Sequence, residues 1–128
     1  MSLRPVHTPN LPKPVGPYSP GMGFERLIFV SGQGATDPTT GQLAGADATA
    51  QTEQCLKNVQ TILEAAGSSL ENVVKVNAYV TDLTRFAEFN EVYKEFFSHD
   101  PPARTTVATS LLGFLVEVDC IAALPEGS

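Results

Sequence analysis

Hydrophobic and polar positions along the chain follow two periodicities, and the period of two predicts a β-sheet. Segments that are β-branched and apolar, or that alternate apolar with polar residues, are typical of strands. They cover residues 26–33, 73–81, 101–110 and 114–124. Prolines and glycines in residues 4–23 predict an extended, irregular lead-in, and "DPTTGQ" at 37–42 predicts a turn.

The second periodicity, with apolar residues three and four positions apart, predicts two amphipathic helices. The first lies between Asp47, a suitable N-cap, and Gly67, which suits the left-handed residue after a helix. Its apolar stripe includes Cys55, which is therefore expected to be a buried, inert thiol. The second helix is predicted over residues 83–98, and its stripe consists of Phe86, Phe89, Tyr93 and Phe97.

The first main strand is apolar on both of its faces. Leu27 and Phe29 point opposite to Ile28 and Val30. Two helices can cover one face of a sheet of four to six strands, and a chain of 128 residues has nothing left for the other face. An oligomer that buries sheet against sheet is therefore expected.

Length and composition predict a single domain over residues 1–128. The net charge of −6 and the scattered basic residues argue against nucleic acid and anionic membranes as partners. Two distant cysteines and the lack of a long apolar segment suit a cytoplasmic protein. No cluster with metal-ligand spacing occurs, so no metal is expected, and neither a P-loop nor a GxGxxG motif is present.

Three polar residues interrupt the apolar pattern. Asn90 falls on the aromatic stripe of the second helix, where it either bonds to a loop or points into a polar site. Glu117, together with Asp119, lies on the sheet face that a partner should cover, unless that end of the strand is open to water. Ser31 shares a face with Leu27 and is weak evidence alone.

Arg104, in "PPARTTV", stands at the entrance of a strand whose geometry the preceding residues restrict. Strand alternation places Arg104 and Thr106 on one face. The five-donor guanidinium suits two-point contact with a carboxylate, which could belong to a protein side chain or to a substrate.

The chain resembles the reactive intermediate deaminase A (RidA, YjgF) family, also called the liver perchloric-acid-soluble protein family. The resemblance covers nearly the whole chain in order. It rests on "GPYSPG" (16–21), "FVSGQ" (29–33), "DPTTG" (37–41), "NVQTILEAAGSSLENVVKVNAYVTDL" (58–83), "FAEFNEVYKEFF" (86–97), "PPARTTV" (101–107) and "LVEVDCIA" (115–122).

This resemblance implies an α+β fold of the bacterial chorismate-mutase type, with a mixed sheet and two helices packed on one face. It implies a homotrimer in which sheets meet and the sites lie between subunits. The implied activity is a 2-iminobutanoate/2-iminopropanoate-type deaminase, which hydrolyses enamines and imines such as 2-aminoacrylate to 2-keto acids and ammonia without a cofactor.

The resemblance also implies roles for individual residues. Arg104 matches the arginine that binds the substrate carboxylate, and Glu117 matches the glutamate near the attacking water. The backbone amide of Thr106, a position that is often cysteine in the family, would contact the ligand carboxylate. The remaining polar or backbone contacts of the pocket match Tyr18, Ser31, Gly32 and Asn90.

Two other functions stay open at this point. One is endoribonuclease or translation-inhibitor activity, which has been attached to relatives and which the acidic charge disfavours. The other is a non-catalytic trimer that binds a small ligand through Arg104 and performs no chemistry.

Overall fold

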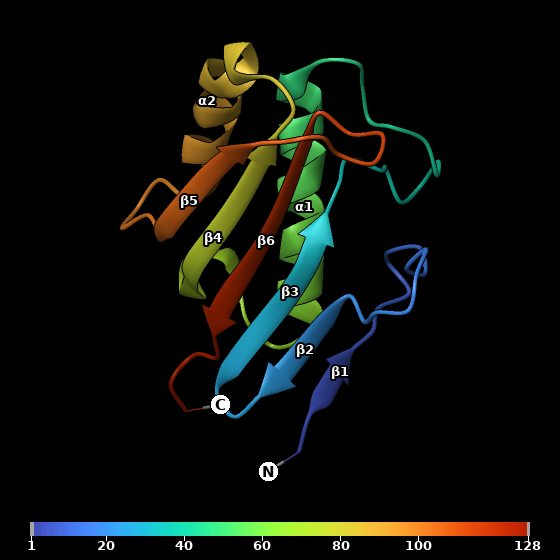
Figure 1. The fold of residues 1–128 in the computed structure, drawn as a ribbon. Helices are drawn as coiled ribbons and strands as arrows, with labels where there is room; N and C mark the ends of the chain where they lie inside the picture. Colours follow the sequence, from blue (N-terminus) through green and yellow to red (C-terminus); the bar gives the residue numbers. More distant parts are fainter. Residues whose placement is uncertain (1, 128) are drawn as a thin grey trace.

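A computed structural model describes residues 2–127, which form one six-stranded sheet and two α-helices (Figure 1). The helices are α1 (Ala48–Ala65) and α2 (Phe86–Phe96), and short 3₁₀ turns at Leu70–Asn72 and Leu83–Arg85 precede β4 and α2. The strands are β1 (Arg4–Val6), β2 (Gly21–Phe24), β3 (Leu27–Gln33), β4 (Val73–Val80), β5 (Ala103–Ala108) and β6 (Val116–Ala123). The predicted α+β class with a mixed sheet and two helices is confirmed.

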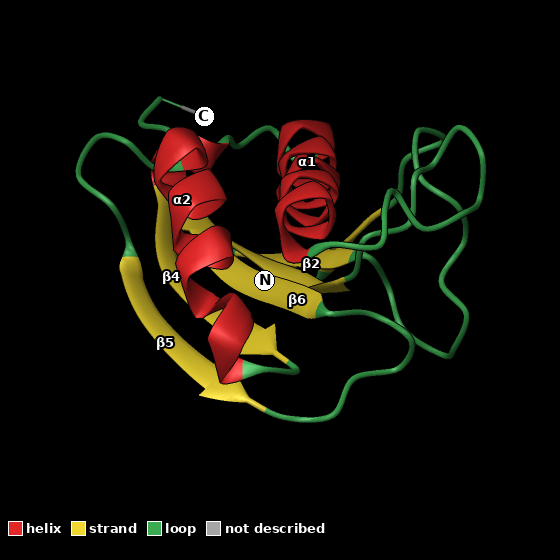
Figure 2. Ribbon diagram, turned by 90° about the horizontal axis from the view of Figure 1, so that it is seen from above, coloured by secondary structure: helices red, strands yellow, loops and turns green. Residues whose placement is uncertain are grey.

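The sheet has the order β1-β2-β3-β6-β4-β5. Every neighbouring pair is antiparallel except β4 and β5, which are parallel. Parallel strands need a long crossover, and α2 provides it. As a result β5, which carries Arg104, forms one edge of the sheet beneath α2 (Figure 2).

Helix α1 forms as the sequence predicts. The Asp47 side chain caps its first turn by accepting a hydrogen bond from the Ala50 amide at 2.7 Å. Gly67 adopts φ +86°, the left-handed conformation that a glycine after a helix allows. The buried residues of the helix include Thr52, Cys55, Leu56, Val59, Ile62 and Leu63.

Both helices lie on the same face of the sheet (Figure 2). Strand residues on that face, such as Ile28, Val76 and Val118, are 2% exposed or less. On the opposite face, which we call the open face, Leu27 and Phe29 are each 39% exposed. The single chain therefore leaves these apolar side chains of β3 uncovered on the open face, as the sequence indicated.

The N-terminal region differs from its prediction, because residues 4–23 contain β1 and most of β2 and not only an irregular lead-in. Pro5 is tolerated because β1 is an edge strand, where a missing N–H costs no ladder hydrogen bond. Gly21 of β2 faces the helix layer, and a Cβ there would lie 3.0 Å from the Ile62 side chain of α1. These residues act through tertiary packing, which the local sequence pattern does not reveal.

The second helix is shorter than predicted. Residues 83–85 form a 3₁₀ turn capped by Asp82, whose side chain accepts a hydrogen bond from the Thr84 amide at 2.9 Å. α2 then runs from Phe86 to Phe96. Its first residues place the aromatic stripe directly against Arg104.

Candidate functional site

A β-bulge in β3 shapes the open face of the sheet. Val30 pairs with Cys120 and Gln33 pairs with Val118, so two residues of β3 stand opposite the single residue Asp119 of β6. These two residues of β3 are Ser31 and Gly32. A bulge bends the strand and redirects its side chains, and here it opens the sheet at residues that the sequence marked as candidates.

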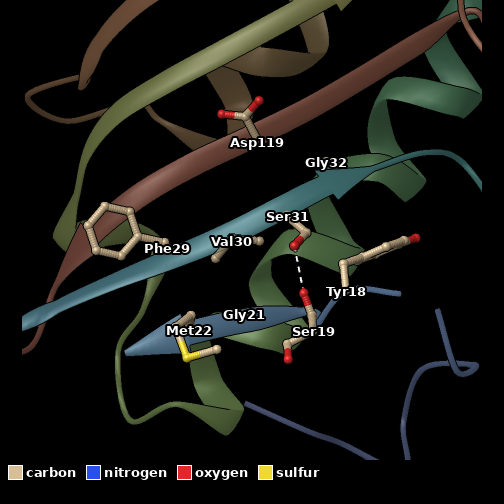
Figure 3. Close-up of a pocket in the computed structure, with 9 residues that line it drawn as sticks. All are labelled: Tyr18, Ser19, Gly21, Met22, Phe29, Val30, Ser31, Gly32 and Asp119. Atoms are coloured by element: carbon tan, nitrogen blue, oxygen red, sulfur yellow. Dashed lines mark hydrogen bonds between the residues drawn. The ribbon is translucent and has the colours of Figure 1, made fainter. Parts of the chain in front are cut away.

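A hollow of about 420 Å³ lies over this bulge (Figure 3). Tyr18 forms one wall and is 49% exposed. The Ser31 hydroxyl donates a hydrogen bond to the Ser19 carbonyl at 2.6 Å. Because its proton is used there, the Ser31 oxygen offers lone pairs to a molecule in the hollow.

Glu117 of β6 extends its side chain over Gly32. A Cβ at position 32 would collide with the Glu117 carboxylate, so glycine provides the space that this side chain occupies. Within residues 2–127 the carboxylate makes no hydrogen bond or ion pair. Burial and, to a lesser degree, the nearby Asp119 carboxylate raise the pKa of Glu117.

Asp119, two residues further on the same face, differs from Glu117 because its carboxylate is hydrogen-bonded. Its two oxygens accept hydrogen bonds from the side-chain amide of Asn77 and the hydroxyl of Tyr79, both at 2.9 Å. The bond to Asp119, together with burial, raises the pKa of Tyr79. Asp119 is thus fixed by its neighbours on β4, whereas Glu117 is free to act on a ligand.

The contact between the Phe114 ring and Gly34 was not predicted from the sequence. The ring lies against Gly34, where a Cβ would collide with it. From the register, Gly34 follows Gln33, which pairs with Val118, and so Gly34 lies level with Glu117. The two glycines of "GQG" (32–34), one near the end of β3 and one directly after it, were the available signal.

We refer to Tyr18, Ser31, Gly32 and Glu117 as the carboxylate half-site. These four residues come together on the open face of one chain. The other predicted residues, Asn90, Arg104 and Thr106, lie elsewhere, and we refer to them as the guanidinium half-site.

Arg104 points toward the helices. It pairs in β5 with Val76, a fully buried residue of the helix-covered face. The guanidinium carbon lies 4.6 Å from the ring centre of Tyr93. No carboxylate of residues 2–127 lies within ion-pair distance of Arg104, so no described side chain neutralises its charge.

Thr106 follows Arg104 on the same face of β5. The Thr109 amide donates to the Val80 carbonyl at 2.9 Å. Amide directions alternate along a strand, so the amides of Arg104 and Thr106 point away from β4 to the free edge. They are available donors beside the guanidinium.

Asn90 lies on α2, four residues after Phe86 and three before Tyr93, both of which contact Arg104. This spacing places it on the Arg104 side of the helix. It is half-buried, and its amide makes no hydrogen bond within the part of the chain described. The sequence alternative of a bond to a loop is not seen there.

The two cysteine thiols are not accessible for reaction. Both cysteines are free and buried, and burial raises the pKa of each thiol, that of Cys120 to about 12. Residues 2–127 contain no group of three potential metal-ligating side chains, and none of their helices is long and apolar enough to cross a membrane.

The fold and the two half-sites define a class: a small α+β protein with an unpaired carboxylate on its open sheet face and an unneutralised guanidinium at its sheet edge. The family model described as Endoribonuclease L-PSP matches residues 8–124. The chain belongs to this RidA/YjgF/L-PSP family.

Individual relatives agree with this assignment. A mouse 2-iminobutanoate/2-iminopropanoate deaminase is 38% identical over 119 residues, covering 91% of this chain and 88% of the mouse protein. The crystal structure of RidA from the Antarctic bacterium Psychrobacter has a TM-score of 0.89 at 37% identity, covering 94% of this chain and 99% of that chain. Escherichia coli TdcF, crystallised with bound serine, has a TM-score of 0.89 at 35% identity, covering 95% and 99%.

Proposed function

We propose that this protein hydrolyses small 2-imino acids and their enamine tautomers to 2-keto acids and ammonia. The observation that carries the proposal is the presence of two unsatisfied charges of opposite sign, Glu117 and Arg104, on opposite faces of one chain. The similarity to the mouse deaminase and to TdcF with its bound amino acid supports this substrate class.

The two half-sites can meet only between subunits. We propose a homotrimer in which the guanidinium half-site of one chain faces the carboxylate half-site of the next. The uncovered apolar residues of the open face, Leu27 and Phe29 among them, support association, and the RidA resemblance implies three subunits. Light scattering should then give three times the chain mass of 13.6 kDa.

In the proposed reaction Arg104 binds the substrate carboxylate at two points and fixes the position of the C=N carbon. The outward amide of Thr106 adds a donor to the same carboxylate. Asn90 and Tyr18 would border the remainder of the substrate. The Ser31 oxygen would accept a hydrogen bond from the imine N–H.

Glu117 would act as the general base. It removes a proton from water as the water oxygen bonds to the C=N carbon, and it passes that proton to the imine nitrogen, which gives a tetrahedral adduct with a hydroxyl and an amino group. Glu117 then takes the hydroxyl proton and passes it to the amino nitrogen, so that ammonia leaves as the hydroxyl becomes the keto C=O. A raised pKa suits this role, because it brings the carboxylate closer to the working pH.

The test uses imines generated in solution from amino acids by an amino-acid oxidase. Release of ammonia and of the 2-keto acid is followed with and without the protein. We expect faster release with the wild-type chain and none of that acceleration in Glu117→Gln. If pyruvate binds but release is not accelerated, the protein is a ligand-binding trimer and the proposed enzyme activity is wrong.

A further inference from the structure

We infer that Phe86, Phe89 and Tyr93 form an aromatic box that positions Arg104 for the substrate carboxylate. The guanidinium carbon lies 5.7, 5.4 and 4.6 Å from the three ring centres, in that order. All three distances fall within the range of about 6 Å in which an aromatic ring attracts a cation. The inference rests on the proposed function, since it explains how the proposed carboxylate ligand is held.

The box is fixed by the core and not by the ligand. Its three residues lie on one stripe of α2, which crosses over β4 and β5 (Figure 2). The Tyr93 ring packs between Phe89, with ring centres 5.5 Å apart, and Phe97, at 4.6 Å. Phe89 is fully buried and Tyr93 is 6% exposed, so neither ring can turn away from Arg104.

The box also leaves the charge and the donors of Arg104 available. An aromatic face attracts the cation without accepting its N–H groups in the guanidinium plane. An internal carboxylate would hold the side chain equally well, but it would neutralise it and occupy the fork. Aromatic rings are therefore the surroundings that orient this arginine while keeping it ready for an external carboxylate.

Tyr93 contributes its ring and not its hydroxyl. The hydroxyl is buried and has no hydrogen-bond partner among the described residues. Burial raises the pKa of Tyr93 to about 12, so the ring stays neutral and offers Arg104 no counter-charge. A phenylalanine at this position would serve the same purpose.

The test compares Tyr93→Leu with Tyr93→Phe, using pyruvate affinity and the KM and kcat of imine hydrolysis as readouts. We expect Tyr93→Leu to weaken pyruvate binding and raise KM by about 3- to 30-fold, with a smaller change in kcat. Tyr93→Phe should stay within about twofold of wild type. Phe97→Leu is the matched control, because the Phe97 ring packs on Tyr93 and is not one of the three rings that lie over the Arg104 guanidinium.

Wild-type pyruvate affinity in Tyr93→Leu, or an equal loss in Phe97→Leu, would overturn the inference. If Tyr93→Leu fails to fold, Phe86→Leu replaces it, since Phe86 is half-buried at the start of α2 and also contacts Arg104. Arg104→Gln separates the two proposals. Unchanged pyruvate binding in Arg104→Gln overturns the proposed function, whereas loss there with full binding in Tyr93→Leu and Phe86→Leu overturns the positioning role alone.

Discussion

The carboxylate half-site and the guanidinium half-site are built by different means. The first lies in the middle of the sheet, where β3 and β6 are paired on both sides and a bulge with Gly32 makes room for Glu117. The second lies on the edge strand β5, where Arg104 is held by aromatic rings of α2. At the first site a glycine leaves the space that the charged side chain occupies, whereas at the second site packed aromatic rings hold the charged side chain in place.

The difference explains how one chain carries two opposite charges without pairing them. Glu117 is on the open face and Arg104 on the helix-covered face, so the sheet separates them. A salt bridge within the chain would use up both groups before a substrate arrived. The separation leaves each group to a ligand, and in the proposed trimer a neighbouring subunit would supply the other half.

The largest expected effect comes from the carboxylate half-site. Glu117→Gln keeps the shape over Gly32 and removes the base, so turnover should fall by roughly 10²–10⁴. Pyruvate binding should survive or tighten, because a negative charge near the keto acid disappears. Oxidase-coupled kinetics and calorimetric binding measure both. A variant with full turnover would show that Glu117 only fills space.

Arg104→Lys should have a smaller effect of a different kind. Lysine keeps the charge but loses the two-point contact and the flat guanidinium that lies over the rings. The loss of a charge-assisted pair is worth about 1.5–3 kcal/mol, which is about ten- to a hundredfold. It should appear in both pyruvate affinity and turnover. Full activity with a large drop in melting temperature would instead make Arg104 a purely structural residue.

Mixing the two impaired variants, Glu117→Gln and Arg104→Lys, tests whether the half-sites come from different chains. In a ring of three, every mixed trimer contains one site with an intact Glu117 and an intact Arg104. Random assembly at equal amounts makes about three-quarters of the trimers mixed, so activity should recover to about a quarter of wild type. Each variant refolded alone is the control. No recovery in mixed trimers would mean that both groups act within one chain.

Local patterns predicted much of this architecture. The periods of two and 3.6 located α1, β4, β6 and the exposed apolar residues of β3 on the open face, because those periods reflect burial directly. β1 and β2 were missed because Pro5 and Gly21 are favoured by their neighbours in space and not by their neighbours in sequence.

In the candidate site, too, some features were predictable from the sequence and others depend on neighbours in space. The resemblance identified Arg104 and Glu117, but their opposite faces became clear only from the strand pairing. The partners of Asp119 and the packing of Phe114 on Gly34 depend on residues 40 or more positions away. The aromatic stripe of α2 was visible in the sequence, but helical spacing does not tell whether a cation or an aliphatic side chain packs on it.

The smallest expected effect is on stability. Burial raises the pKa of Glu117 above its unfolded value of 4.5, so the folded chain holds this proton to a higher pH than the unfolded chain does. Wild-type stability should therefore fall as pH rises from 4.5 through the folded pKa. Glu117→Gln has no ionisable group at this position and therefore does not lose this stability as pH rises. Because the carboxylate is partly solvated, we expect its melting temperature at neutral pH to rise by only about 1–3 °C.

The sign of that shift also reports whether the two half-sites touch. A substrate carboxylate must fit between them, so Glu117 should remain unpaired in the empty trimer, and the gain of Glu117→Gln should vanish below pH 4.5, where Glu117 is protonated in both states. Asp119→Asn is the control with the opposite sign, since Asp119 is bonded to Asn77 and Tyr79 and its loss should lower the melting temperature. If Glu117→Gln also lowers the melting temperature at neutral pH, Arg104 of a neighbouring chain closes directly onto Glu117. The half-sites would then neutralise each other without a substrate, and the separation that the single chain maintains would be lost on assembly.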